Sequence, residues 1–253
     1  MDNPLEKARQ SLDEGDTAAA EQYARQALNP PSAEAWLLLA QVQSEAENLR
    51  GAHESALAGL QLEPENPDLL MLLGDLCFEL RQPEKALEAY AKLIELDSAD
   101  ADAWASRGVV YLENNNLEKA EEACRQAVKL DPANVFALNA LGDICFARGD
   151  ASAAVSCYKQ AAEQDPEDPQ PHLSLAELHY EEGRLQQAEE CCQECLHRDA
   201  GLAAAYLILG NVCLDQDRNQ QAVQHFSQFL RLEKDPEAKQ IRDEVAAVID
   251  GLN

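Results

Sequence analysis

The sequence lacks both long hydrophobic runs and a basic, apolar leader. No segment approaches the roughly 18 consecutive apolar residues that a membrane-spanning helix needs. The chain opens with Met1-Asp2-Asn3-Pro4, which lacks the basic-then-apolar pattern of a secretory signal. These absences predict a cytoplasmic protein that does not insert into a membrane.

Basic residues are also few. The 253 residues include 20 lysines and arginines against 47 aspartates and glutamates, which gives a formal net charge of −27 at pH 7. Because such a polyanion repels phosphate groups, nucleic acid and anionic membrane are poor partners. We expect a protein or peptide with basic and apolar residues instead. The acidity is equally consistent with the helix preference and the solubilising effect of glutamate.

Catalytic motifs are missing as well. The chain has no glycine-rich phosphate loop, no H-E-x-x-H zinc helix and no G-x-S-x-G nucleophile elbow. The nearest fragment, His53-Glu54, lacks the second histidine of a zinc helix. We therefore expect no enzymatic activity, no catalytic residue and no cofactor.

A period of about 34 residues runs through the chain instead. Neighbouring units have helical hydrophobic spacing, and a unit of this size cannot bury its apolar face alone, so neighbours must stack. An extended binding surface is therefore expected rather than an enzyme pocket. The period is marked by seven alanines spaced 32 and then five times 34 residues apart, namely Ala20, Ala52, Ala86, Ala120, Ala154, Ala188 and Ala222.

Within a unit, a large residue at the fourth place precedes leucine at the seventh place and a very small residue at the eighth. Leu138 and Leu141-Gly142 show this pattern in the fifth unit. A small residue lets the second helix approach the first closely. Several units close on a proline that ends the second helix, namely Pro64, Pro132 and Pro166.

These residues resemble the tetratricopeptide repeat family from residue 1 to about 234. The resemblance implies an all-α, right-handed superhelical solenoid of seven helix-turn-helix repeats with a C-terminal capping helix. The first repeat, with Pro4 and Lys7 at core positions, and Arg107 in place of the usual leucine depart from the family pattern. One domain, 1–253, is expected, with repeats 1–32, 33–66, 67–100, 101–134, 135–168, 169–202 and 203–236 and a capping helix over 237–250.

Two local features complete the expected fold. The turn inside each unit needs a residue that tolerates left-handed backbone, and Gly15, Asn115, Gly149, Gly183 and Asp217 occupy that place. The capping helix is amphipathic. Its apolar residues Ile241, Val245 and Val248 are expected to cover the apolar face left by Leu209, Phe226 and Phe229.

Eight cysteines recur mainly at interior repeat places. They are most simply small core residues of a protein in a reducing compartment. The sixth unit leaves an alternative open, because Cys192 and Cys195 share a helix face that in this family meets the helix carrying His179. Two thiolates and an imidazole could bind zinc or copper or sense redox state. The expected outcome remains that no metal is bound.

In tetratricopeptide proteins the first helix of each repeat lines the concave groove with its second, fifth, ninth, twelfth and thirteenth places. In the second to seventh repeats none of these places carries a cation, so the resemblance does not extend to members that clamp a C-terminal carboxylate. The apolar residues at the twelfth place could also simply pack between adjacent first helices. The expected partner-binding residues are Asp75, Phe78, Glu79, Val109, Leu112, Glu113, Asn139, Asp143, Phe146, Glu177, Tyr180, Glu181, Asn211, Leu214 and Asp215.

The resemblance implies a protein–protein interaction adaptor or scaffold of the assembly-factor or co-chaperone type. Its partner would bring a basic and apolar segment to the concave groove. Two alternatives stay open. One is a metal-binding or redox-sensing module that uses Cys192, Cys195 and His179. The other is a structural scaffold that self-associates through its terminal repeats.

Overall fold

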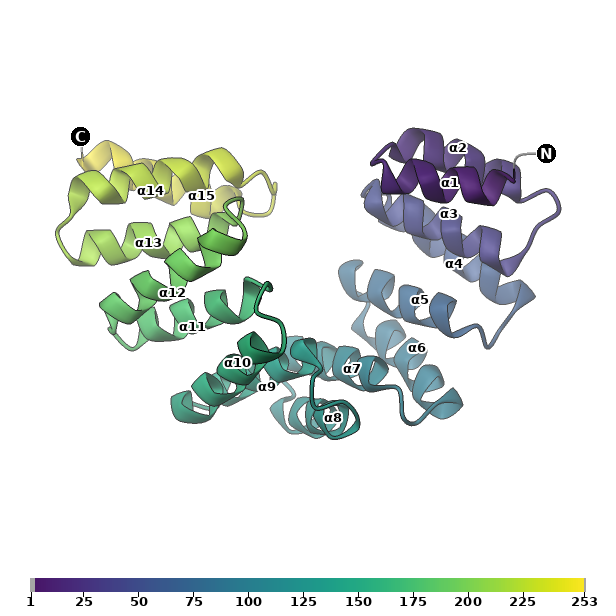
Figure 1. Ribbon diagram of the computed structural model, residues 1–253, viewed down its shortest axis with the longest axis horizontal. Helices are drawn as coiled ribbons and strands as arrows, with labels where there is room; N and C mark the ends of the chain where they lie inside the picture. The colour runs from purple at the N-terminus through teal and green to yellow at the C-terminus, as the bar shows by residue number, and fades with distance from the viewer. Residues whose placement is uncertain (1–2, 253) are drawn as a thin grey trace. The chain divides into compact units, whose positions relative to one another are not determined.

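The computed structural model describes residues 3–252, and the ordered elements of that range are all α-helices (Figure 1). Met1, the expected start of the first repeat, lies outside the described residues. No described helix is long and apolar enough to cross a membrane. The helices are α1 Pro4–Asp13, α2 Thr17–Ala27, α3 Ala33–Glu45, α4 Leu49–Leu62, α5 Pro67–Glu79, α6 Pro83–Leu96, α7 Ala101–Glu113, α8 Leu117–Leu130, α9 Val135–Ala147, α10 Ala151–Gln164, α11 Gln170–Glu181, α12 Leu185–Arg198, α13 Ala203–Asp215, α14 Asn219–Leu232 and α15 Lys239–Leu252.

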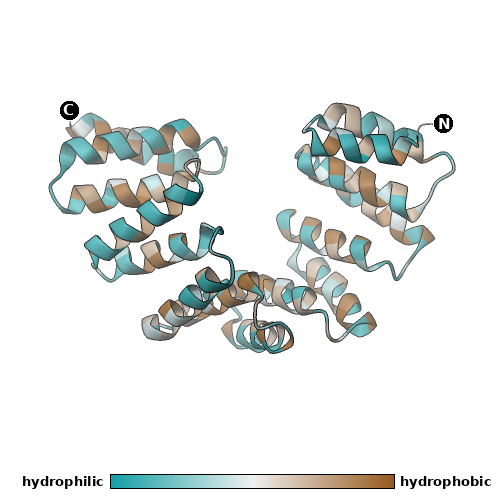
Figure 2. Cartoon of the chain, in the orientation of Figure 1, coloured by the Kyte–Doolittle hydropathy of each residue, from teal (hydrophilic) through white to brown (hydrophobic). Residues whose placement is uncertain are grey.

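Consecutive helices pack as pairs, from α1 with α2 to α13 with α14. The chain forms two compact units, Met1–Pro132 with α1 to α8 and Ala133–Asn253 with α9 to α15. Inside each unit, the second helix of one pair packs against the first helix of the next. The hydrophobic and hydrophilic residues of each helix are interspersed along its length, as expected of amphipathic helices that pack in pairs (Figure 2).

The first helices α1, α3, α5, α7 and α9 begin where a polar side chain caps them. Asn66 Oδ1 accepts a hydrogen bond from the Leu69 backbone N–H at 3.1 Å, and Asn134 Oδ1 accepts one from Ala137 at 2.8 Å. Such caps satisfy N–H groups that have no partner inside the helix. The cap thus reinforces the period-based start of these five helices, whereas α11 and α13 have no side-chain cap. α11 begins one residue later than the period predicts, because Pro169 serves as its N-cap.

The turn inside each repeat is left-handed at one residue. The expectation is confirmed for Gly15, Asn115, Gly149, Gly183 and Asp217. Glu47 and Arg81 occupy the same place with φ of 58° and 57°. Sequence type did not indicate these two residues, because glutamate and arginine ordinarily avoid that region. The two flanking helices hold the turn in this conformation in every repeat.

We predict that Glu47→Gly stabilises the protein by about 0.5 kcal/mol. Glycine adopts the left-handed conformation without strain, and this gain exceeds the entropy lost when the more flexible unfolded chain becomes ordered. Gly149→Ala is the matched reverse change. A Cβ at Gly149 would meet no atom within 4 Å, so its expected cost of about 1 kcal/mol comes from the backbone alone. Urea denaturation followed by circular dichroism measures both. A loss of stability in Glu47→Gly would contradict the prediction.

The core is built on small residues that face large ones. All seven periodic alanines are fully buried. In three repeats, a ring at the twenty-fourth place lies directly over glycine at the eighth place. A Cβ at the glycine would clash with that ring in each of the pairs Gly74–Tyr90, Gly142–Tyr158 and Gly210–Phe226. The small residues of the repeat pattern are therefore required by the close approach of the two helices.

The closing helix α15 covers the end of the second unit. Val245 is buried, and Val248, Ile249 and Leu252 pack with it against a cluster that contains Phe226 and Phe229. The expectation is confirmed for Val245 and Val248, but it is wrong for Ile241, whose surface is 45% exposed. It is also wrong for Leu209. That residue packs in the cluster of Cys192 and Cys195, because it lies on the side of α13 that faces α11 and α12.

Val245→Asp should therefore destabilise the second unit by about 3 kcal/mol or more, because it buries an unpaired carboxylate. Ile241→Asp, one helical turn earlier on the same helix, should change the free energy of unfolding by less than about 0.5 kcal/mol. Thermal and urea melts of the two variants provide the comparison. Equal losses in both would show that α15 packs in a different register.

Candidate partner-binding surface

In the second unit, the first helices α9, α11 and α13 contact one another in sequence. Of the expected binding residues here, all except Asn139 keep exposed surface. Asn139 is only 8% exposed, and its Oδ1 has no hydrogen-bond partner among the described residues. We use the name first-helix surface for the remaining eight residues of this unit, which are Asp143, Phe146, Glu177, Tyr180, Glu181, Asn211, Leu214 and Asp215.

The carboxylates of the first-helix surface act on one another. Burial raises the pKa of Glu177, and the neighbouring charges of Asp143 and Glu181 raise it further. Burial also raises the pKa of Tyr180, with a smaller contribution from a hydrogen bond to Asp215. Negative charge is thus crowded across α9, α11 and α13. A cation placed among these groups would relieve that repulsion.

Three apolar residues lie among these acids at the twelfth place of successive repeats. Phe146, Tyr180 and Leu214 are each half-buried. Phe146 packs against the cluster of Tyr158 and Leu178. Tyr180 packs against the cluster of Cys192 and Leu209, and Leu214 against that of Phe226 and Val245. Each residue therefore has a fixed base and an exposed edge. Both readings of the sequence apply in part, because these side chains pack between repeats and also remain accessible.

Two of the expected binding acids have an additional structural role. The Tyr158 hydroxyl donates a hydrogen bond to Asp143 Oδ1 at 2.7 Å, and the Tyr90 hydroxyl donates one to Asp75 Oδ1 at 2.6 Å. Sequence reasoning missed these bonds. A signal was present, because in repeats two to seven tyrosine at the twenty-fourth place occurs only where the ninth place is aspartate. Burial and the nearby carboxylate both raise the pKa of each tyrosine, so the hydroxyls stay protonated as donors.

Tyr158→Phe should destabilise the second unit by about 1.5 to 3 kcal/mol, because it removes a part-buried hydrogen bond to a charged group. Tyr206→Phe is the control, since the Tyr206 hydroxyl makes only an exposed bond to the Ala200 carbonyl at 3.3 Å. Chemical denaturation of both variants measures the difference. The structural role of Tyr158 is refuted if both variants are as stable as the parent protein.

The first unit distributes its expected binding residues over two shallow clefts. Phe78 and Glu113 line a cleft of about 220 Å³ together with Arg81. Asp75 lines another of about 460 Å³ with Met71. The remaining residues of the expected set, Glu79, Val109 and Leu112, are exposed or half-buried. Arg81 was missed because it belongs to the turn, outside the five places that the family uses.

The surroundings of the cysteines bear on the metal-binding alternative. All eight are free thiols, and no group of three or more His, Cys, Asp or Glu residues in the range 3–252 is arranged to hold a metal ion. Cys192 and Cys195 lie in a hydrophobic cluster with Leu209. Burial raises the pKa of both thiols, that of Cys195 to about 11, and lowers the pKa of His179. Buried protonated thiols are poor ligands and poor nucleophiles, so these surroundings give no support to the metal-binding or redox-sensing alternative at these residues.

With this geometry established, comparison with known proteins identifies the family. The sequence matches the family model for the cilia and flagella-associated protein 70 C-terminal domain over residues 1–246. The chain belongs to this family. No curated protein matches the sequence.

Solved tetratricopeptide structures share the fold. A tetratricopeptide repeat protein from Parabacteroides merdae has 21% identity and a TM-score of 0.80, over 98% of this chain and 97% of that one. A chain of the APC/C hetero-tetramer Cut9–Hcn1 has 14% identity and a TM-score of 0.76, over 91% of this chain and 48% of that one. Yeast Tom70 has 15% identity and a TM-score of 0.75, with coverages of 98% and 53%. The chain thus spans about half the length of the latter two proteins. The all-α tetratricopeptide solenoid is confirmed, and this architecture is that of a protein-interaction scaffold.

Proposed function

We propose that this chain is a non-enzymatic adaptor of the assembly-factor or co-chaperone type, which holds a basic and apolar segment of a partner protein. The first-helix surface of the second unit is the proposed binding site. The observation that carries the proposal is the residue composition of the first-helix surface. Phe146, Tyr180 and Leu214 present exposed edges among four carboxylates, and none of its eight residues is a cation.

The apolar and the acidic residues of the surface would contribute to binding in different ways. Half-buried aromatic side chains on a fixed base are good anchors, because they lose little conformational freedom on binding. The carboxylates at the rim accelerate association and select a basic partner. A segment that alternates apolar and basic side chains would meet both requirements. Crowded charge around Glu177 favours an incoming lysine or arginine.

The proposed location is the cytoplasm, since free thiols and a buried cysteine set suit a reducing compartment. The family takes its name from a protein associated with cilia and flagella, so ciliary and flagellar proteins are the first candidates for the partner. Self-association through the terminal repeats has less support at the C-terminal end. There α15 buries Val245 and packs Val248, Ile249 and Leu252 against the core, while apart from Ile241 its exposed residues are mainly polar.

A partner isolated by affinity purification allows the test. Phe146→Ala should weaken its binding by at least about 1 kcal/mol, roughly fivefold in Kd. Glu177→Lys with Glu181→Lys should slow association and flatten its dependence on salt. Gln193→Ala, on an exposed position of α12, is the matched control. Stopped-flow and equilibrium titrations give the rate and affinity.

The assignment fails if the Phe146 and glutamate variants bind the partner like the parent protein while Gln193→Ala abolishes binding. Circular dichroism of each variant separates lost contact from lost folding. Phe146→Ala removes a side chain that is partly packed, so its thermal stability is measured as well. Both glutamates keep exposed surface, although the Glu177 carboxyl is partly buried. The melting temperature of the double variant is therefore measured as well, and a small change is expected.

A further inference from the structure

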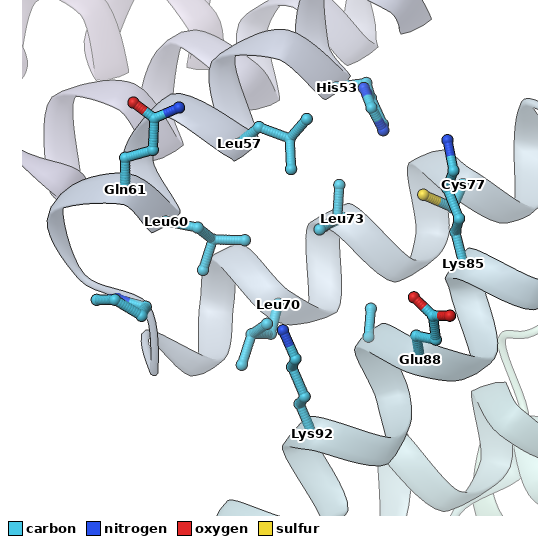
Figure 3. A pocket seen from close by; sticks show the side chains of 12 residues that line it. His53, Leu57, Leu60, Gln61, Leu70, Leu73, Cys77, Lys85, Glu88 and Lys92 are labelled. Carbon is cyan, nitrogen blue, oxygen red and sulfur yellow. The ribbon is translucent and has the colours of Figure 1, made fainter.

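A cleft of about 480 Å³ opens in the first unit between α4 and α6, with α5 as its floor (Figure 3). The floor consists of Leu70, Leu73 and Cys77, at the fourth, seventh and eleventh places of the repeat. Leu57 and Leu60 from α4 form one wall. Leu57 is 41% exposed, so the apolar lining reaches the surface. The proposed partner site uses other faces of the first helices.

Two lysines form the opposite wall. Lys85 and Lys92 project from α6 over the apolar floor, with Glu88 between them (Figure 3). Lys85 donates a hydrogen bond to Gln82 Oε1 at 2.6 Å, while Lys92 forms no salt bridge within residues 3–252. Both ammonium groups lie on exposed residues. The cleft thus carries a local excess of positive charge in a chain whose net charge is −27.

His53 lies across the cleft from Lys85 (Figure 3). Burial lowers the pKa of this imidazole, and the charge of Lys85 lowers it further. The neutral ring is therefore favoured near pH 7, so the two lysines supply the positive charge. The remaining charged group of the lining, Glu88, offsets only one of them.

The lysines distinguish this cleft from the equivalent places of other repeats. On α9 the same three floor residues recur as Leu138, Leu141 and Cys145, but Ala153 and Gln160 stand on α10 where α6 has Lys85 and Lys92. On α7 the same three places carry Trp104, Arg107 and Tyr111, and the Arg107 guanidinium stacks at 4.8 Å from the Trp104 ring centroid and 5.7 Å from that of Tyr111. This stack occupies the floor with its own cation. In the second unit, the cleft over α11 has three glutamates in its lining against Lys159 and Arg198. Of these sites, only the cleft over α5 combines an open aliphatic floor with an excess of lysine.

We propose that the cleft between α4 and α6 is a second protein-binding site, which takes a short segment with a large apolar side chain flanked by aspartate or glutamate. The apolar side chain lies over Leu73 between Leu57 and Leu60. The flanking carboxylates pair with Lys85 and Lys92. Charge complementarity sets the class of occupant, because lysine ammonium groups next to an apolar floor favour a segment that carries both features. This partner is opposite in charge to the one proposed for the first-helix surface.

A display library of random 12-residue peptides selected against the whole chain provides the probe. Enriched peptides are synthesised with a fluorophore, and their Kd is measured by fluorescence anisotropy. We expect a class with an aliphatic or aromatic residue next to aspartate or glutamate. Lys85→Glu with Lys92→Glu should weaken this class at least tenfold, and Leu57→Ser should weaken it severalfold.

Lys129→Glu with Lys234→Glu is the control, since both lysines are exposed outside the cleft lining and the change in net charge is identical. This control should alter Kd by less than twofold. Phe146→Ala should leave these peptides unaffected, which separates the proposal from that for the first-helix surface. The proposal is overturned if no acidic and apolar class is enriched, if that class binds the Lys85 and Lys92 variant as tightly as the parent, or if the control variant loses as much affinity.

Discussion

The close approach of the two helices within each repeat is the contact on which the rest of the structure depends. Where the twenty-fourth place carries a ring, the eighth place is glycine, as in Gly142 beneath Tyr158. Where it carries alanine, the eighth place is alanine too, as in Ala40 and Ala56. The same tyrosine that fills the space over Gly142 holds Asp143 at the surface. Packing and surface charge are therefore set by one pair of positions.

Charge is sorted between the faces of single helices. The first-helix surface holds acids, apolar residues and Asn211 but no cation. Cations occur on other faces, as in the α4–α6 cleft and in the stack of Arg107 on Trp104 and Tyr111. Successive residues of an α-helix are rotated by about 100° around its axis. Residues that are neighbours in the sequence can therefore lie on different surfaces of the protein. Such separation would let the two proposed sites of one scaffold select different partners by repelling the wrong one.

The period, the buried alanines and most helix starts could be predicted from the sequence, because each repeat supplies the same local signal again. The left-handed Glu47 and Arg81 could not, since the flanking helices impose that conformation on unfavourable residue types. The exposure of Ile241 depends on how α15 meets α14, which hydrophobic spacing alone does not specify. The α4–α6 cleft escaped prediction because three helices from two repeats must be placed before their side chains leave a space.

The Arg107 stack on α7 limits how far the apolar floor of the α4–α6 cleft extends along the first unit. Since Trp104, Arg107 and Tyr111 fill on α7 the places that Leu70, Leu73 and Cys77 leave open on α5, an occupant of the α5 floor meets a plug one repeat later. The segment proposed for the α4–α6 cleft would therefore not extend over α7. Its recognition would depend on a few residues of one inter-repeat step rather than on an extended strand.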